Sequence, residues 1–210
     1  MISVFTQQNF HSLCDRLAAA DASFSTIISA SGYPPFWSRP NTFESLVHII
    51  LEQQVSVASA LSALQKLKEK TGIISAENLL ILSDEELKAC YFSRQKTVYA
   101  RDLAQNLLNE NLDLQALEFL PDEEIRQKLT SIKGIGNWTT DIYLMFVLHR
   151  TDIFPLGDLA AVNSLKKIKS LPKETPKERL LQIAEAWKPF RTIATMLLWQ
   201  EYLNRRVKIK

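Results

Sequence analysis

Apolar side chains recur every three or four residues along most of the chain, with polar residues between them. This spacing is typical of helices that bury one face. The longest such stretch runs from Asn41 to Gly72. We expect Asn41 to cap its start, with Glu44 three residues later, and Gly72 to end it. Its apolar positions are Leu46, Ile49, Ile50, Val57, Leu61, Leu64 and Leu67.

Other helix boundaries follow from similar local signals. Ser83 and Glu86 form the pattern of a capping box, and Pro121 with Asp122 opens a helix with acidic residues in its first turn. Pro189 separates two late helical runs, "LLQIAEAWK" and "RTIATMLLWQEYLNRR". Strand-like alternation is rare. The pattern predicts an all-α fold with roughly ten helices joined by short segments.

Composition narrows the classes of function. A length of 210 residues suits one large domain or two small lobes, and a net charge of +2 gives no general attraction to nucleic acid, although a local basic patch could supply it. Cys14 and Cys90 lie far apart without a CxxC motif, which argues against a disulfide scaffold and against a zinc or iron–sulfur cluster. Neither a signal peptide nor a membrane-spanning apolar run is evident, so we expect a cytoplasmic protein.

Two glycines stand one residue apart in "SIKGIGNWTTD", residues 131–141. We expect a helix at 122–131, a tight hairpin at 132–136 and a second helix at 137–149. A dinucleotide-binding loop would need a preceding strand and a third glycine, and the sequence offers neither.

This hairpin could bind a phosphate. Gly134 and Gly136 permit backbone conformations that a side chain would forbid, and they leave N–H groups exposed at a helix N-terminus. Lys133 adds a positive charge, so a DNA phosphate could bind there without any reading of base sequence. A structural turn capped by glycine explains the same residues, and the motif alone leaves both interpretations open.

Four blocks occur in a fixed order along the chain. "IILEQQVSVASA" comes first and "LTSIKGIGNWTTD" second; Asp158 in "IFPLGDLAAVNSL" follows Trp138 by 20 residues, and "AEAWKPFRTIATMLLW" comes last. Together they resemble the helix-hairpin-helix DNA glycosylase superfamily, and within it the bacterial 3-methyladenine DNA glycosylase II type.

The resemblance implies two helical lobes with a DNA-binding cleft between them. One lobe would comprise residues 42–150 and contain the hairpin. The other would combine residues 1–41 with 151–210 and carry the aspartate. Larger bacterial relatives have an additional N-terminal domain with β structure, and from the resemblance we expect this chain to lack it.

Asp158 is the candidate for catalysis. After "PLG" it is a natural N-cap, because its carboxylate can accept hydrogen bonds from the first turn of the next helix, whose dipole favours the ionised form. A fixed carboxylate can stabilise an oxocarbenium-like sugar while a glycosidic bond breaks. The resemblance implies this role for Asp158, with help in activating water. Capping alone would also explain the residue.

Trp138 and Trp199 match tryptophans that line the base pocket in the 3-methyladenine type. Aromatic faces attract cations, and a purine alkylated at N3 or N7 is positively charged. Glycosylases that also cut the strand have a nucleophilic lysine where this chain has Trp138, so the resemblance implies a monofunctional enzyme without lyase activity. Core packing is the alternative explanation for each tryptophan.

Base removal requires that the nucleotide leave the duplex and that a side chain fill the gap. In "EQQVSV", Gln54 stands where the wedge residue of the family, commonly a leucine, is found. A glutamine can fill space and hydrogen-bond to the unpaired base but stacks less well; a solvent-facing helix position is the alternative. The resemblance assigns DNA contacts at the hairpin to Lys133, Gly134, Ile135 and Gly136.

The sequence thus predicts a monomeric DNA glycosylase that releases alkylated purines from double-stranded DNA and leaves an abasic site, nucleoid-associated if the source is bacterial. We expect no required cofactor, no iron–sulfur cluster and no membrane association. The resemblance leaves open a monovalent cation at the hairpin. Alternatives are a non-catalytic helix-hairpin-helix DNA-binding protein, a structural all-α interaction protein, and a glycosylase for uracil or an oxidised base.

Overall fold

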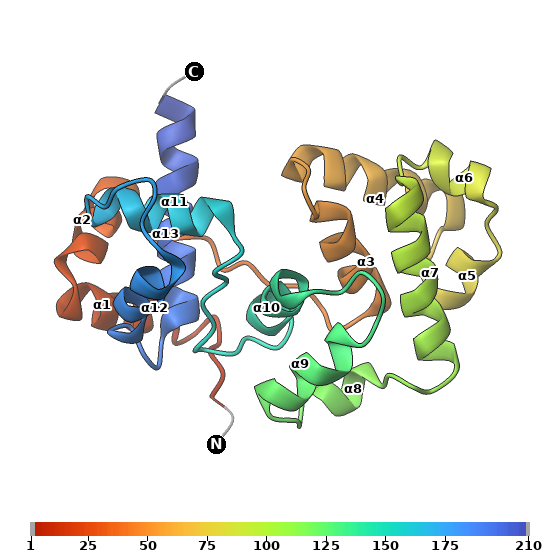
Figure 1. Ribbon diagram of the computed structural model, residues 1–210, viewed down its shortest axis with the longest axis horizontal. Coiled ribbons are helices and arrows are strands. Elements are labelled where there is room, and N and C mark those ends of the chain that lie inside the picture. The colour runs from red at the N-terminus through yellow and green to blue at the C-terminus, as the bar shows by residue number, and fades with distance from the viewer. Residues whose placement is uncertain (1–2, 209–210) are drawn as a thin grey trace. The chain divides into compact units, whose positions relative to one another are not determined.

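The computed structural model describes residues 3–208 of the chain, and within them it contains thirteen helices and no strand beyond a single antiparallel bridge between Val4 and Arg150 (Figure 1). The all-α prediction is confirmed. The helices outnumber the ten or so expected because several are only one or two turns long. They are α1 (Phe10–Ala20), α2 (Ala22–Ser31), α3 (Phe43–Glu52), α4 (Val57–Thr71), α5 (Ala76–Leu80), α6 (Asp84–Ala89), α7 (Arg94–Leu108), α8 (Leu114–Leu117), α9 (Asp122–Thr130), α10 (Asn137–Phe146), α11 (Leu159–Ile168), α12 (Lys177–Glu185) and α13 (Arg191–Lys208).

Local capping signals largely decide where these helices begin and end. Ser83 and Glu86 form the expected capping box at the start of α6, α9 begins directly after Pro121, and Gly72 ends α4 with a φ of 70°. Pro189 lies between α12 and α13 as expected. The helix expected at 137–149 is shorter, since α10 ends at Phe146.

The stretch from residue 41 to 72 departs from its prediction in two ways. It forms two helices, α3 and α4, separated by residues 53–56. The cap of α3 is Thr42, whose side chain accepts from the Ser45 N–H, so the assignment to Asn41 is wrong by one residue. The Asn41 amide instead donates to the Leu114 carbonyl at 2.7 Å and accepts from the Tyr143 hydroxyl at 2.7 Å, so it joins distant segments.

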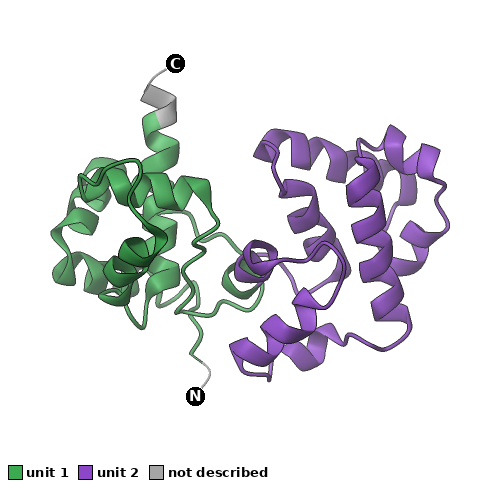
Figure 2. Cartoon of the chain, viewed as in Figure 1, with its two compact units in different colours: residues 1–38, 144–210 green, residues 39–143 purple. Residues whose placement is uncertain are grey.

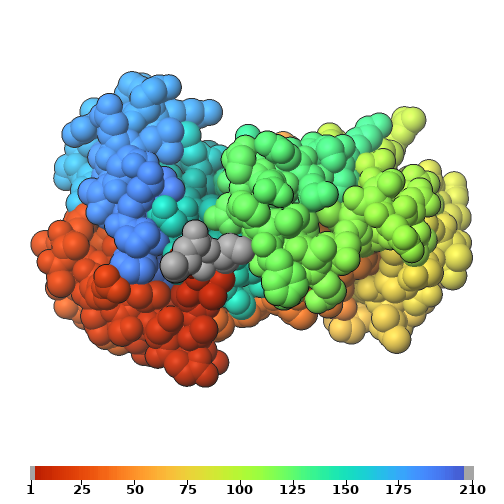
Figure 3. All heavy atoms as spheres, turned by 90° about the horizontal axis from the view of Figure 1, so that it is seen from below, coloured from red at the N-terminus to blue at the C-terminus, as the bar shows by residue number. Residues whose placement is uncertain are grey.

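The chain divides into two compact units, residues 1–38 with 144–210 and residues 39–143 (Figure 2). In the first unit α13 packs against α1, α2 and α11, and its residues 192–198 are all buried. A helix that is buried on nearly all sides must be apolar on nearly all sides. Figure 3 shows the N-terminal and C-terminal segments, red and blue, side by side on one face, in agreement with these contacts.

The second unit is built around α3, which packs against α4 and α7, while α5 and α6 pack against α7. Five apolar side chains of α3 are at most 1% exposed, which makes this helix the core of the unit: Leu46, Val47, Ile49, Ile50 and Leu51. Because α3 is fixed on several sides, the loop that follows it leaves from a rigid point. None of the helices in residues 3–208 is both long and apolar enough to cross a membrane.

Candidate functional site

The hairpin between α9 and α10 depends on Gly134 in two respects. Its φ is 85°, a region that L side chains rarely adopt, and a Cβ added there would lie 2.0 Å from Cγ of the Tyr99 ring. The prediction that the turn needs glycine is confirmed at this position. At Gly136 it is wrong, because that φ is not positive and an added Cβ would meet no atom within 4 Å.

The backbone of the hairpin leaves a small set of donors for an anion. The Ile135 N–H donates to the Ile132 carbonyl, and the Ile135 side chain is only 3% exposed, so that residue anchors the turn in the core. The Lys133 N–H donates to Asp102 Oδ2 at 2.8 Å, while its side chain is exposed. Within residues 3–208 the amides of Gly134 and Gly136 have no acceptor, and Gly136 directly precedes the N-terminus of α10.

An ion pair fixes the two helices of this motif to each other. Arg126 on α9 donates to Asp141 Oδ1 on α10 at 2.6 Å, and the Asp141 side chain is only 10% exposed. Burial raises the pKa of Asp141, and the Arg126 guanidinium opposes that rise without cancelling it. Sequence reasoning did not identify this pair, although both residues lie within the segment that it singled out.

The loop between α3 and α4 exposes Gln54 at its tip. Gln54 has a φ of 56°, which is uncommon for a residue other than glycine, and residues 54–59 are all exposed. Two apolar neighbours, Val55 and Val57, are 47% and 64% exposed. The competing interpretation of Gln54 as an ordinary helix residue is wrong, because the helix ends at Glu52.

Gln53, which sequence reasoning passed over, connects this loop to the hairpin. Its Nε2 donates to the Gly134 carbonyl and to Thr139 Oγ1, each at 2.9 Å. The partners are 81 and 86 residues away along the chain, so no local signal could have revealed the contact.

Asp158 caps α11 in the other unit, as predicted. Its Oδ1 accepts from the Ala161 N–H at 2.8 Å and also from the Trp199 indole N–H at 2.9 Å. The second bond was not anticipated. Two N–H donors directed at one carboxylate oxygen are complementary to its negative charge and fix its orientation.

Trp199, which donates to Asp158, packs against two other aromatic rings. Trp199 lies 5.4 Å from Phe146 and 6.0 Å from Trp37, centroid to centroid, and the Trp37 ring is nearly perpendicular to it at 81°. Trp199 is half-buried, so its indole takes part in packing while it donates to Asp158. The structure thus gathers Trp37, Phe146, Asp158 and Trp199 within one unit; we call this group the Asp158 cluster.

Trp138 lies in the first turn of α10, directly after the hairpin, and is half-buried. It belongs to the unit of residues 39–143, whereas Asp158 and Trp199 belong to the other. The position that a nucleophilic lysine would take therefore holds an indole in the folded chain. Contact of Trp138 with a base stays a prediction.

Comparison with known proteins identifies the family to which this chain belongs. Residues 47–189, more than half of the chain, match the HhH-GPD superfamily of base excision DNA repair proteins. The chain belongs to this superfamily. Its α9–hairpin–α10 segment is the helix-hairpin-helix, and the resemblance inferred from the four sequence blocks is confirmed.

Individual relatives of this HhH-GPD protein are 3-methyladenine DNA glycosylases. The structure of the Schizosaccharomyces pombe enzyme Mag1 in complex with abasic DNA superposes with a TM-score of 0.83 at 28% identity, over 90% of this chain and 95% of that one. The DNA-3-methyladenine glycosidase of Bacillus halodurans gives 0.77 at 30% identity, over 91% and 89%. The Bacillus subtilis protein YfjP, provisionally named a DNA-3-methyladenine glycosylase, is 27% identical over 186 residues, which are 85% of this chain but only 65% of YfjP.

Metal chemistry has no evident site in the described part of this HhH-GPD protein. Across residues 3–208 no three His, Cys, Asp or Glu side chains gather as ligands for an ion, and Cys14 and Cys90 are buried and unpaired. Burial raises the pKa of the Cys14 thiol to about 12, which makes it unreactive.

Proposed function

We propose that this protein is a monofunctional DNA glycosylase that flips alkylated purines of the 3-methyladenine and 7-methylguanine type out of duplex DNA and hydrolyses their N-glycosidic bond. The product would be an abasic site. The observation that carries the proposal is the Asp158 carboxylate, held by one backbone N–H and one indole N–H beside a group of aromatic rings.

The chemistry needs little more than this carboxylate. As the glycosidic bond breaks, positive charge develops on the sugar, and a fixed anion stabilises it without having to reorganise. Asp158 is prevented from turning by its two donors, so its charge stays where it is needed. In the second half of the reaction the same group can accept a proton from the attacking water.

The substrate class follows from the leaving group and from the aromatic surroundings. A purine alkylated at N3 or N7 already carries a positive charge and departs without protonation, so a site with one assigned carboxylate is sufficient. The rings of Trp37, Phe146 and Trp199 offer π faces that favour a cationic base over a neutral one. The relatives named above as 3-methyladenine glycosylases support this assignment.

DNA engagement is assigned to the other unit. The free amides of Gly134 and Gly136, with the exposed Lys133 side chain, form an anion site suited to one phosphate of the damaged strand. Gln54, exposed at a loop tip, is the candidate that fills the gap left by the flipped base.

The absence of an amine in the lysine position supports the monofunctional assignment. A Schiff base requires a neutral amine next to the sugar, and the equivalent position is occupied by Trp138. Borohydride treatment during turnover should therefore trap no covalent enzyme–DNA adduct. A trapped species would contradict this part of the proposal.

The decisive experiment compares base release from methylated duplex DNA by the wild type and by Asp158→Asn, with the freed bases separated and identified. Asparagine is itself a good N-cap, so this change removes the charge while the cap of α11 is kept. Asp113→Asn is the matched control, since Asp113 caps α8 through the Gln115 and Ala116 N–H groups in the other unit.

Release of 3-methyladenine or 7-methylguanine by the wild type and by Asp113→Asn, but not by Asp158→Asn, is the expected result. Equal release by Asp158→Asn would refute the role of Asp158. No release by any of the three, with duplex binding intact, would favour another lesion first and a non-catalytic DNA-binding protein second.

A further inference from the structure

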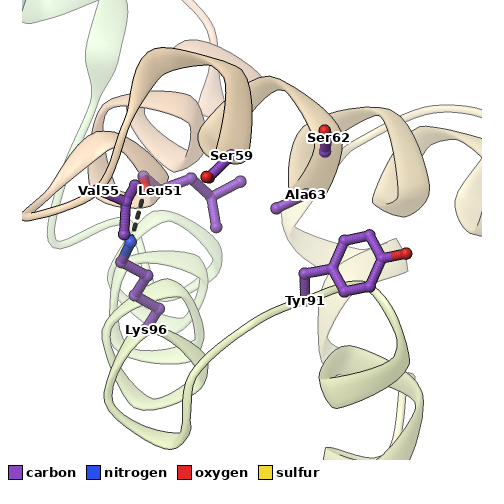
Figure 4. Close-up of a pocket in the computed structure, with 7 residues that line it drawn as sticks. All are labelled: Leu51, Val55, Ser59, Ser62, Ala63, Tyr91 and Lys96. Carbon is purple, nitrogen blue, oxygen red and sulfur yellow. Dashed lines mark hydrogen bonds between the residues drawn. The ribbon is translucent and has the colours of Figure 1, made fainter.

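The three residues before Gln54 are each fixed by a different segment of the same unit. The Leu51 carbonyl accepts from Lys96 Nζ on α7 at 2.6 Å, as Figure 4 shows. Glu52 accepts a bidentate pair of hydrogen bonds from Arg39. Gln53 donates to the hairpin. The loop that carries Gln54 is therefore attached by polar contacts immediately before its tip.

Packing does little to hold the far side of this loop. A cavity of about 260 Å³ lies beside it, between Val55 and the Tyr91 ring, and Val55 itself is 47% exposed (Figure 4). Gln54 also adopts a positive φ, which persists only where the surroundings determine the backbone strongly. The three polar anchors lie immediately before this residue and fix the backbone that leads into it.

Of the three anchors, only the one from Gln53 reaches the hairpin. Lys96 and Arg39 hold the end of α3 to α7 and to the segment before α3. Gln53 uses both hydrogens of its amide, one on the Gly134 carbonyl and one on Thr139 Oγ1. A carbonyl can only accept, so the nitrogen of the Gln53 amide must face Gly134.

We propose that Gln53 is a positioning residue that sets the distance between the phosphate site at the hairpin and the Gln54 side chain. This inference rests on the proposed function, since it assigns the hairpin to the damaged strand and Gln54 to the gap. The hairpin would fix one nucleotide of the backbone, and Gln54 must then enter the helix at a fixed offset from it. Small errors in such an offset cost far more than a single contact is worth.

The side-chain amide of Gln53, which directly precedes the wedge candidate Gln54, also contacts Gly134, the residue that shapes the turn. Gly134 provides the positive φ of the hairpin, and its carbonyl is one of the two acceptors of Gln53. Thr139, the other acceptor, is 2% exposed in the first turn of α10. Loss of the Gln53 amide would therefore leave the buried Thr139 hydroxyl and the partly exposed Gly134 carbonyl without their donor, while the exposed Lys133 side chain would remain in place.

The test is Gln53→Met, which keeps the length of the side chain and removes both donors. Thr139→Val removes only one of the two bonds and serves if Gln53→Met does not fold. Gln65→Met is the matched control, because Gln65 is an exposed residue of α4 whose amide donates to Glu69 on the same helix. Thermal unfolding of each variant checks that it is folded.

The readout is the affinity for a duplex with an abasic-site analogue divided by the affinity for an undamaged duplex, both measured by fluorescence anisotropy. Insertion of Gln54 contributes to the first affinity and not to the second. We expect Gln53→Met to lower this ratio by about tenfold, the effect of roughly two hydrogen bonds, and Thr139→Val to lower it by less. The affinity of both variants for the undamaged duplex should stay within about twofold of the wild-type value, as it should for Gln65→Met.

An unchanged ratio in both variants would overturn the inference. A parallel loss of affinity for both duplexes would also overturn it, because that result means general loosening of the hairpin. The inference fails as well if the wild type shows no preference for the abasic duplex. Failure of the proposed function is separate: it shows as no base release by the wild type, while the affinity ratio still decides the role of Gln53.

Discussion

The hairpin and the Asp158 cluster are built in opposite ways. The hairpin is a continuous segment of five residues whose shape depends on one glycine, and the donors that we assign to a ligand are backbone amides. The Asp158 cluster brings together side chains from residues 37, 146, 158 and 199, which only the packed unit places side by side. A backbone site of the first kind suits a ligand that every DNA offers, the phosphate. A side-chain site of the second kind suits the step that distinguishes one base from another.

This contrast predicts that changes in the Asp158 cluster affect chemistry and leave DNA binding intact. Trp199→Phe keeps an aromatic ring but removes the indole N–H that fixes Asp158. We expect base release to slow by on the order of 100-fold, a typical effect of losing one preorganised donor. Single-turnover release rates measure this effect, and undamaged-duplex affinity is the control. A large loss of that affinity would mean that the two regions do not divide the work as proposed.

Changes in the hairpin should do the reverse, and the two glycines provide a matched pair. Gly134→Ala places a side chain at a φ of 85° and against Tyr99, so we expect a loss of about 2 kcal/mol in stability together with weaker binding to all duplexes. Gly136→Ala meets open space and should change stability by less than about 0.5 kcal/mol. Denaturant unfolding of both variants checks this; equal effects would contradict the distinction drawn between the glycines.

Protonation of Asp21 in acid should lower the stability of the unit that contains Asp158. Burial alone would raise the pKa of Asp21, but hydrogen bonds from Lys169, Trp187 and Ser23 outweigh it and hold that pKa at about 2, below the ordinary 3.8. A carboxyl with a lowered pKa contributes stability above its ordinary pKa and loses it as the pH falls towards the folded value. The wild type should thus exceed Asp21→Asn by about 1 to 2 kcal/mol near pH 6 and lose that advantage between about pH 4 and pH 2.

Thermal unfolding of the two proteins across this pH range measures the difference. The difference in stability between the wild type and Asp21→Asn should be constant between pH 5 and pH 7, where Asp21 stays ionised. A difference that grew as the pH fell would show that the sign of the pKa shift is wrong.

The smallest effect concerns the Lys133 side chain, which is exposed and contributes charge alone. Lys133→Ala should weaken binding to damaged and undamaged duplexes alike, by less than about tenfold, and should reduce the slope of log affinity against log salt by about 1. Titrations at several salt concentrations measure both quantities. A loss confined to one lesion would show that Lys133 contacts the base rather than the phosphate.

Local features of this protein were readable from its sequence because they depend on residues three or four positions apart. The capping box of Ser83 and Glu86, the glycine end of α4 and the Asp158 cap on Ala161 all close within one helical turn. The need for Gly134 is likewise local in its positive φ. Helical periodicity, summed over many turns, determined the all-α class for the same reason.

Tertiary structure decided the rest. Ile50 and Val57 are seven residues apart, which is two helical turns, so the apolar spacing did not reveal the break between α3 and α4. Ser56 caps the new helix locally, while three polar anchors from elsewhere in the unit hold the end of α3. Thr42 replaces Asn41 as the cap because the Asn41 amide is engaged by residues 114 and 143. The bond from Trp199 to Asp158 spans 41 residues, and the bond from Gln53 to Gly134 spans 81. Contacts at such separations form only when the whole unit packs, and no spacing along the chain encodes them.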